Sequence, residues 1–199
     1  MPDDDHWATY HAAQHRRPPR DLLLRALTLT GPGRGRTAID LGCGAGIETR
    51  ALLSAGWRVL AIDGDPGTEP RLRRTIGGHS PRLTISTIPY ADLTALPTAD
   101  LIYAGYSLPF QNRESFDRIW SLVRAANPRW LAVNLFGVHD AWAADPEMTF
   151  LTGTEARSLT DGMSLAYWDE QDAVGPAFRG PKHWHVFDLI ATTDVDSRF

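Results

Sequence analysis

The 199-residue sequence has little of what disulfide-rich, zinc-cluster or membrane-spanning proteins require. Its single cysteine, Cys43, excludes an internal disulfide and any multi-cysteine zinc site. No apolar run approaches the roughly 20 residues that cross a bilayer, so we expect no membrane partner. The acidic first residues lack the apolar core of a secretory signal. One thiol fits a reducing compartment, and we expect a cytoplasmic protein.

Positive charge is also scarce. Lysine and arginine number 20 against 24 acidic residues, which leaves a net charge of −4. Nucleic-acid binders usually carry a basic footprint, so we expect a small-molecule substrate and no nucleic-acid partner. Two short arginine clusters are expected to form solvated faces: Arg16, Arg17 and Arg20, and Arg71, Arg73 and Arg74.

What the sequence does have is an ordinary globular composition, with 43% hydrophobic and 22% charged residues. This length fits one domain, acting as a monomer or homodimer, since domains commonly run to about 100–200 residues. The Gly-Pro-rich stretch 31–35 is the clearest break. It predicts a helical N-terminal arm or lid over residues 1–30 and a main domain over residues 31–199.

Within residues 31–199, segments typical of strands and helices alternate. We expect strands at 36–41, 57–62, 83–88, 101–104 and 130–136, helices at 47–55 and around 116–123, and a short helix that opens at the capping box 152–155. A final antiparallel pair is expected at 163–168 and 185–191, separated by a polar loop. Such alternation predicts an α/β fold with a mostly parallel sheet covered by helices on both faces.

The most informative motif is a glycine-rich turn, Asp40-Leu41-Gly42-Cys43-Gly44-Ala45-Gly46, which joins the first predicted strand to a helix. Glycines let a ligand approach the backbone without meeting a Cβ atom, and the helix presents unpaired N–H groups. Asp63, at the end of the next strand, could accept hydrogen bonds from ribose hydroxyls. Asp40 could orient the turn and, through water, meet an ammonium group of the ligand.

A dinucleotide-binding dehydrogenase is the obvious competitor for this motif. Its Gly-x-Gly-x-x-Gly pattern needs a third glycine where this chain has Ile47, one position after Gly46. Asp40 before the first glycine also favours a methyltransferase over a dehydrogenase. A bare strand-to-helix turn without a ligand is the remaining alternative, which Asp40 and Asp63 together disfavour.

Residues 38–46 resemble the first motif of class I S-adenosylmethionine-dependent methyltransferases, and Asp63 matches the ribose-binding acid of that family. The resemblance spans about residues 36–110. It implies a Rossmann-like, seven-stranded, mostly parallel sheet that ends in a C-terminal antiparallel hairpin. It also implies that Asp92 and Leu93 approach adenine, and that Ala104, Gly105 and Tyr106 lie beside the methionine part of S-adenosylmethionine.

One residue departs from the family pattern, and a second feature points to a particular subgroup of the family. The position after the ribose-binding acid often holds a bulky residue that packs on adenine, and here it is Gly64. The short length and the N-terminal Trp7-x-x-Tyr10 pattern resemble small tellurite-resistance-type methyltransferases, which implies that Tyr10 folds over the cofactor. The expected cofactor-binding residues are therefore Tyr10, Asp40, Gly42, Gly44, Gly46, Asp63, Gly64, Asp92, Leu93 and Ala104.

Candidates for the chemistry lie in loops after the later strands. We expect Tyr106, His139 and His183 to be catalytic or to bind the acceptor. Alternation puts His183 and His185 on one face, where they could serve as a base, a clamp or two ligands of a metal. With no third ligand at a convincing spacing, we expect no metal. Aromatic residues of the second half could line a pocket or fill the core: Trp142, Phe150, Trp168, Phe178 and Trp184.

The sequence thus predicts methyl transfer from S-adenosylmethionine to an oxygen, nitrogen or sulfur atom of a small molecule. The alternative from another class is a non-catalytic sensor or partner subunit that keeps the cofactor fold. The loop after the predicted fourth strand lacks the Asn-Pro-Pro-Tyr arrangement of amino-methylating nucleic-acid enzymes.

Overall fold

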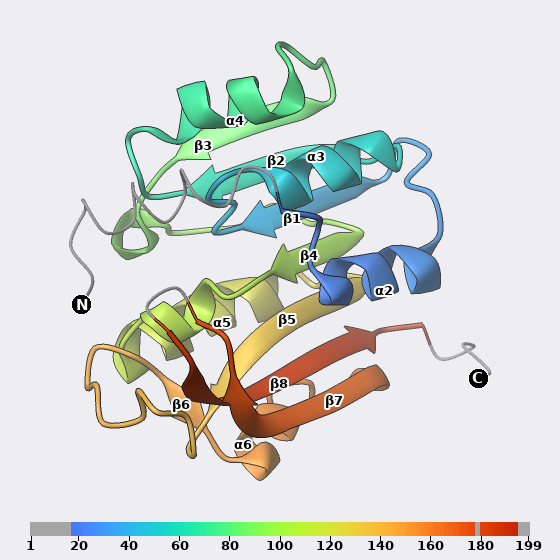
Figure 1. Cartoon of the computed structure of the whole chain (residues 1–199). Helices are drawn as coiled ribbons and strands as arrows, with labels where there is room; N and C mark the ends of the chain where they lie inside the picture. The colour runs from blue at the N-terminus through green and yellow to red at the C-terminus, as the bar shows by residue number, and fades with distance from the viewer. Residues whose placement is uncertain (1–16, 178–179, 195–199) are drawn as a thin grey trace.

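The computed structural model of the chain describes residues 17–177 and 180–194. Their strands form one mixed sheet in the order β3-β2-β1-β4-β5-β8-β7, with short β6 paired beside β5 (Figure 1). The strands are β1 (Thr37–Leu41), β2 (Arg58–Asp63), β3 (Leu83–Thr87), β4 (Leu101–Ala104), β5 (Trp130–Gly137), β6 (Phe150–Leu151), β7 (Ser164–Gly175) and β8 (Lys182–Thr192).

Strands β1 to β5 pair in parallel, whereas β8 runs antiparallel to both β5 and β7. The predicted Rossmann-like sheet with its C-terminal antiparallel hairpin is confirmed. The two-residue β6 is an additional strand beside the seven of the main path. Because parallel strands end at the same edge, the loops after β1, β2, β4 and β5 lie together at one end of the sheet.

Helices cover both faces of the sheet, as predicted (Figure 1). Leucines and alanines of α2 and α3 pack with β1, β2 and β4 on one face, and α4 packs there beside the Gly-rich turn. The apolar side of α5 packs with Ala156 of α6 on the other face. The helices are α2 (Asp21–Thr30), α3 (Ile47–Ser54), α4 (Thr68–Ile76), α5 (Arg113–Ala125) and α6 (Gly153–Ser158), with 3-10 turns η1 (Tyr90–Asp92) and η2 (Leu108–Phe110).

The short helix α6 begins as its sequence indicates. The Thr152 side chain accepts a hydrogen bond from the backbone N–H of Glu155, and the Glu155 carboxylate accepts one from the backbone N–H of Thr152. The predicted capping box is therefore confirmed. α2 packs against β5 and β8, while residues 1–16, which include Trp7, Tyr10 and His11, lie outside the described residues.

Two elements differ from the sequence prediction. α4 went unpredicted because only Thr68 and Leu72 are buried in it, so it shows no apolar stripe. The final hairpin is much longer than predicted, because the polar residues 169–175 belong to β7 and not to a loop. β7 lies at the edge of the sheet, where polar side chains face solvent and look like a loop in sequence. None of the described helices has the length and apolarity needed to traverse a membrane.

Candidate active site

The Gly-rich turn sits at the carboxyl end of β1 and is fastened to the end of β2. The backbone N–H groups of Gly42 and Cys43 both donate to the carbonyl oxygen of Ile62, at 2.8 and 3.0 Å. Gly46, directly before α3, has a φ of +79°, in the left-handed region that favours glycine. The turn therefore has a fixed shape, with the N-terminal end of α3 facing the same end of the sheet.

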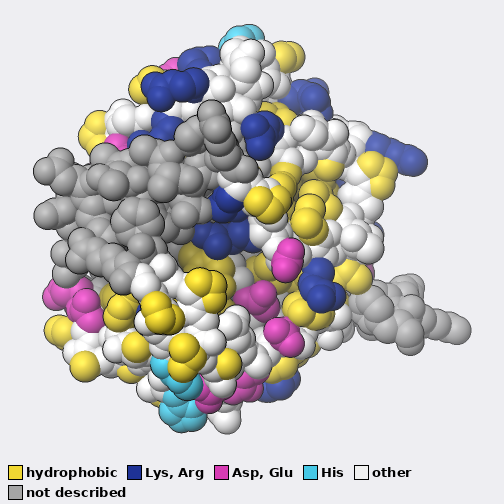
Figure 2. Space-filling view, in the orientation of Figure 1, with side chains coloured by type: hydrophobic (Ala, Val, Ile, Leu, Met, Phe, Trp, Pro, Cys, Tyr) yellow, Lys and Arg dark blue, Asp and Glu magenta, His cyan; other side chains and the backbone are white. Residues whose placement is uncertain are grey.

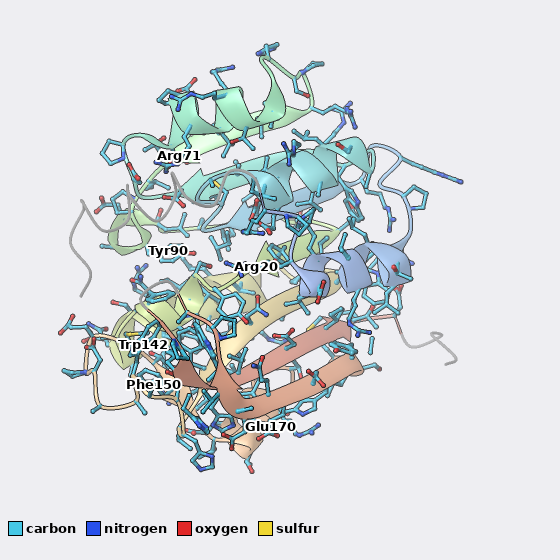
Figure 3. The ribbon with its side chains drawn as sticks, viewed as in Figure 1. Arg20, Arg71, Tyr90, Trp142, Phe150 and Glu170 are labelled. Atoms are coloured by element: carbon cyan, nitrogen blue, oxygen red, sulfur yellow. The ribbon has the colours of Figure 1, made fainter. Side chains whose placement is uncertain are left out.

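Gly42 is required at its position by space as well as by its φ of +79°. A Cβ atom there would lie 2.2 Å from the Cβ of Ser107 and 2.8 Å from the hydroxyl oxygen of Tyr90. The Ser107 hydroxyl donates to the carbonyl oxygen of Leu41 at 2.7 Å, which ties the loop after β4 to β1. Tyr90, which Figure 3 labels on η1, is half-buried with its hydroxyl oxygen fully buried, and it is a residue of the site that sequence reasoning missed.

The predicted ribose-binding acid, Asp63, contacts the turn directly. Its Oδ2 accepts a hydrogen bond from the backbone N–H of Gly44 at 2.7 Å. Its Oδ1 accepts from the backbone N–H of Asp65 at 3.0 Å and from the Thr68 hydroxyl at 3.3 Å. Oδ2 has a second lone pair, so the half-buried carboxylate keeps acceptor capacity for a ligand. The structure thus brings Gly44 and its neighbours in the turn together with Asp63.

Asp40, which precedes the turn, is buried, and its Oδ2 accepts a hydrogen bond from the Thr49 hydroxyl at 2.5 Å. Burial, followed by the nearby negative charge of Glu48, raises the pKa of Asp40 to about 7. A carboxyl group with this pKa is ionised only in part at neutral pH. A cationic group bound nearby would therefore favour its ionised form.

Arg71 of α4 holds the turn from its outer side (Figure 3). Its Nε donates to the carbonyl oxygen of Gly44 at 3.1 Å, and its Nη1 pairs with Asp65 at 2.9 Å. The prediction of a solvated face is wrong for Arg71, which is 18% exposed, whereas Arg73 and Arg74 are exposed as predicted. Since α4 itself went unpredicted, no sequence pattern indicated that one of its arginines would turn inward.

The first arginine cluster also turns inward in part. Arg17 forms a two-pronged ion pair with buried Glu48, at 2.6 and 2.7 Å. The guanidinium carbon of Arg20 lies 4.4 Å from the centre of the Tyr106 ring. Arg17 and Arg20 thereby connect the segment before α2 to the start of α3 and to the loop after β4. The predicted solvated face is wrong for these two residues.

The remaining predicted cofactor residues surround the same end of the sheet. Ala104 is buried at the end of β4, Leu93 is buried after η1, and Asp92 is exposed. A Cβ atom on Gly64 would lie 3.0 Å from the backbone Cα of Pro89, which explains why no bulky residue follows Asp63. Tyr10 lies outside the described residues.

Tyr106 has a φ of +51°, an uncommon conformation for a non-glycine residue and one that clusters at functional sites. Its ring lies 5.9 Å from that of Phe136 and 6.3 Å from that of Trp184, centre to centre. Phe136 is the centre of an aromatic cluster at the ends of β4, β5 and β8. The other members, hereafter with Phe136 the aromatic wall, are Tyr106, Phe110, Trp142, Phe150 and Trp184.

The aromatic wall encloses the single lysine of the chain, Lys182. Its Nζ lies 3.5 Å from the centre of the Trp142 ring and 3.8 Å from that of Trp184, and it forms an ion pair with fully buried Asp140. Burial lowers the pKa of Lys182. Sequence reasoning missed Lys182. The one hint in the sequence was that the chain has no other lysine. Of the other aromatics in the second half, Trp168 packs on Phe187 elsewhere, and Phe178 lies outside the described residues.

His139 and His183 lie close to each other but not beside Tyr106. Both hydrogen-bond to Asp172 of β7. Successive residues of a strand point to opposite faces, so His183 lies across β8 from Trp184 of the aromatic wall. Cys43 is buried against Ala61 and Leu72, and burial raises the pKa of its thiol, as suits a packing residue.

Comparison with known proteins places this arrangement in context. No protein-family model matches the chain. Over 116 residues, or 57% of the chain, it is 31% identical to a ribosomal RNA small subunit methyltransferase A from Sphingopyxis alaskensis. That match spans only 43% of the relative's length.

Solved structures match over nearly the whole chain. TehB from Haemophilus influenzae superposes with a TM-score of 0.75 at 14% identity, covering 95% of this chain and 68% of TehB. Magnesium protoporphyrin IX methyltransferase from Synechocystis, solved with bound S-adenosylhomocysteine, gives 0.70 at 15% identity and covers 94% of both chains. The chain therefore has the fold of these solved structures, one of which is a methyltransferase with bound S-adenosylhomocysteine, and its Gly-rich turn is hydrogen-bonded to Asp63.

Proposed function

We propose that the chain transfers the methyl group of S-adenosylmethionine to an oxygen, nitrogen or sulfur atom of a small molecule. The observation that carries this proposal is the contact between Asp63 and the N–H of Gly44 at the shared end of β1 and β2. It joins the two parts of a nucleoside site, an acid for ribose hydroxyls and a turn that a ligand approaches without meeting a Cβ atom. The aromatic wall begins at Tyr106, two residues beyond the end of β4.

The residues present fit the cofactor. A Cβ atom on Gly42 would meet Ser107 and Tyr90, so the turn keeps this shape only with glycine at that position. Asp40 directly precedes the turn, and the cofactor's ammonium group, bound nearby, would favour its ionised form despite the raised pKa. Asp92, after β3, would accept from the adenine amino group. We also propose that Tyr10, from the predicted arm, covers the bound cofactor.

When bound, S-adenosylmethionine supplies an activated methyl group on a positively charged sulfur. The chain's own contribution would be alignment, since in-line transfer depends on holding the reacting atoms in near-attack geometry. Tyr106, held between Arg20, Phe136 and Trp184, would form the wall against which a flat or apolar acceptor lies. The roles of His139 and His183 as general bases stay predictions.

A nucleic-acid acceptor is the second candidate, because the sequence relative is a ribosomal RNA methyltransferase. Two features of this chain favour a small molecule instead. Its net charge is −4, and Ser107, in the loop that would face the acceptor, uses its hydroxyl to bond Leu41. A third possibility, a sensor that binds the cofactor without turnover, shares the same cofactor site.

The experiment is a turnover assay of S-adenosylhomocysteine release, with calorimetric binding of S-adenosylhomocysteine measured in parallel. The protein is offered a metabolite panel and, separately, ribosomal RNA and small ribosomal subunits. Turnover on the panel supports the proposal, and turnover only on RNA replaces it with the second candidate. Binding without turnover on either set identifies a sensor, and absence of binding overturns the cofactor itself.

A further inference from the structure

Three of the seven histidines of the chain gather on one face of the β7–β8 hairpin. His183 and His185 lie on β8, and His139 reaches them from the loop after β5. β7 contributes two carboxylates to the same face, Glu170 and Asp172, and Asp172 stands directly opposite His185 in the strand register. Figure 2 shows histidine side chains, in cyan, beside acidic side chains at this edge of the molecule.

Asp172 is the centre of this group. His139 Nδ1 lies 2.8 Å from its Oδ2, and His183 Nε2 lies 2.5 Å from its Oδ1. The three side chains are 64%, 41% and 39% exposed for His139, His183 and Asp172, so ions in solution reach them freely. The two imidazoles hold the pKa of Asp172 at about 2, which keeps its carboxylate ionised at neutral pH.

Buried His185 contacts His139 and holds it in place. Its Nδ1 accepts a hydrogen bond from the backbone N–H of His139 at 3.0 Å, which leaves its proton on Nε2 facing Glu170 at 3.1 Å. Its ring stacks on that of His139, with the centres 4.7 Å apart. Because both of its nitrogens are committed, His185 orients His139 rather than offering a lone pair outward. Glu170 thus fixes the ring of His185, and His185 in turn fixes the backbone of His139.

We propose that His139 Nδ1, His183 Nε2 and the Asp172 carboxylate bind a divalent transition-metal ion of the zinc type. His139 Nδ1 and His183 Nε2 each contact a different oxygen of the Asp172 carboxylate, at 2.8 and 2.5 Å. His139 and Asp172 also form, with the supporting His185, a group whose potential ligand atoms lie within 4.8 Å of one another. Two imidazoles with one carboxylate suit zinc and its neighbours rather than magnesium or calcium. Three protein ligands leave a fourth, tetrahedral position for water.

For a metal ion to bind, the imidazoles of His139 and His183 must each carry their proton on the ring nitrogen that faces away from Asp172. In the present pairing, each imidazole directs an N–H group at Asp172. In the metal-bound form those two nitrogens use their lone pairs, and each neutral ring carries its proton on its other nitrogen. The sequence alone could not reveal this site, because the third ligand, Asp172, is 11 residues from His183 and meets it only through the hairpin register.

The site is separate from the cofactor site. β7 lies five strands from β2, which carries Asp63, a separation of about 24 Å at the usual strand spacing of about 4.8 Å. Figure 3 shows the same separation, with Arg71 beside the Gly-rich turn and Glu170 at the opposite side of the sheet. Metal binding and cofactor binding can therefore be measured independently of each other.

The test is calorimetric titration of Zn²⁺ into the full chain, freed of any affinity tag and treated with chelator, with Co²⁺ absorption as a second readout. We expect one site with a tetrahedral Co²⁺ spectrum. Asp172→Asn combined with His183→Ala should weaken binding by at least about a hundredfold, because loss of a supporting residue alone costs about 10–100-fold. Glu170→Gln should weaken binding by about tenfold and keep the tetrahedral spectrum.

Two controls separate this site from other histidines. Changing His6, His11 and His15 to alanine together, and changing exposed His79 to alanine, should each leave Zn²⁺ affinity unchanged. Thermal unfolding in the presence of chelator verifies that every variant is folded. Absence of Zn²⁺ binding, or binding that survives the Asp172→Asn/His183→Ala variant, would overturn the proposal and leave the cluster as a set of ion pairs.

Discussion

The Asp63 carboxylate accepts a hydrogen bond from the backbone N–H of Gly44, with 2.7 Å between oxygen and nitrogen. This contact joins the end of β2 to the turn after β1, so the proposed ribose-binding acid also sets the shape of the proposed methionine-binding turn. Thr68 and the Asp65 backbone hold the other carboxylate oxygen. The two halves of the proposed cofactor site are thus held together by these hydrogen bonds.

Asp63→Ala should weaken S-adenosylhomocysteine binding by about 1.5–3 kcal/mol, the usual worth of hydrogen bonds to a charged group. That corresponds to roughly 10–150-fold in Kd by calorimetry. Asp117→Ala, which removes an exposed acid on α5, is the matched control and should bind normally. Unchanged affinity in Asp63→Ala would mean that another acid binds the ribose.

Gly42→Ala should abolish measurable cofactor binding and destabilise the fold. The matched control is Gly77→Ala, because Gly77 has a nearly equal φ of +82° but a Cβ atom there would meet nothing within 4 Å. Both variants carry the left-handed backbone penalty of about 1–2 kcal/mol. Only Gly42→Ala adds a collision with Ser107, so urea unfolding should show a larger loss for it. Equal losses would contradict the packing of Gly42 against Ser107.

Asp40→Asn should change how stability depends on pH. The pKa of Asp40 is raised from 3.8 to about 7 in the folded chain. The folded state therefore binds the proton more tightly, so this stability is present below pH 4 and is lost as the pH rises through about 7. At 1.36 kcal/mol per pKa unit, the loss is of the order of 4 kcal/mol.

Asn cannot ionise, so the variant should lack this part of the pH dependence. Urea unfolding of both proteins at pH 5 and pH 8 measures it, and the variant should gain stability relative to the parent chain at pH 8. The same pH dependence in both proteins would show that Asp40 is not the titrating group.

Lys182→Met should destabilise the chain by about 3–5 kcal/mol, because it leaves the buried Asp140 carboxylate without its cation. Two backbone N–H groups, those of Trp142 and His185, also bond Asp140, which favours the lower end of that range. The double variant with Asp140→Asn should recover part of the loss. Additive losses in this double-mutant cycle would contradict the ion pair.

Tyr106→Ala should lower kcat by about a hundredfold, the effect of a small misplacement of reacting groups, while S-adenosylhomocysteine affinity stays nearly the same. Tyr167→Ala is the control, because Tyr167 also lies under an arginine, Arg25, but on the outer hairpin. Once an acceptor is identified, steady-state kinetics tests both variants. A large loss of cofactor affinity in Tyr106→Ala would move Tyr106 to the cofactor side.

The arrangement around the Gly-rich turn was predictable because it depends on residues that are close in sequence. A buried strand, a run of glycines and an acid one strand later are adjacent in sequence, and the structure places Gly42, Gly44, Gly46 and Asp63 together. The strands β1, β2, β4 and β5 likewise follow from short apolar runs, and their bounds differ from the prediction by a residue or so at each end.

Other contacts were not predictable because they join segments that are far apart in sequence. Lys182 and Asp140 are 42 residues apart, and only the turn after β5 brings them together. The inward direction of Arg71 depends on α4, a helix that shows no apolar stripe. The sequence predicted that Asp172 lies in a polar loop, whereas in the structure it belongs to β7 and pairs with His185. No periodicity encodes such pairings, since each is set by contacts between distant segments.

Strand β7 is an outer edge of the sheet, and an edge strand offers unpaired N–H and C=O groups to any other extended chain. Twelve residues long, it would be a strong template for intermolecular pairing were it apolar. Its exposed acids, Asp169, Glu170 and Asp172, instead repel a second copy of the same edge. Neutralising these charges would remove that repulsion, so conditions that do so should favour self-association of the chain through β7.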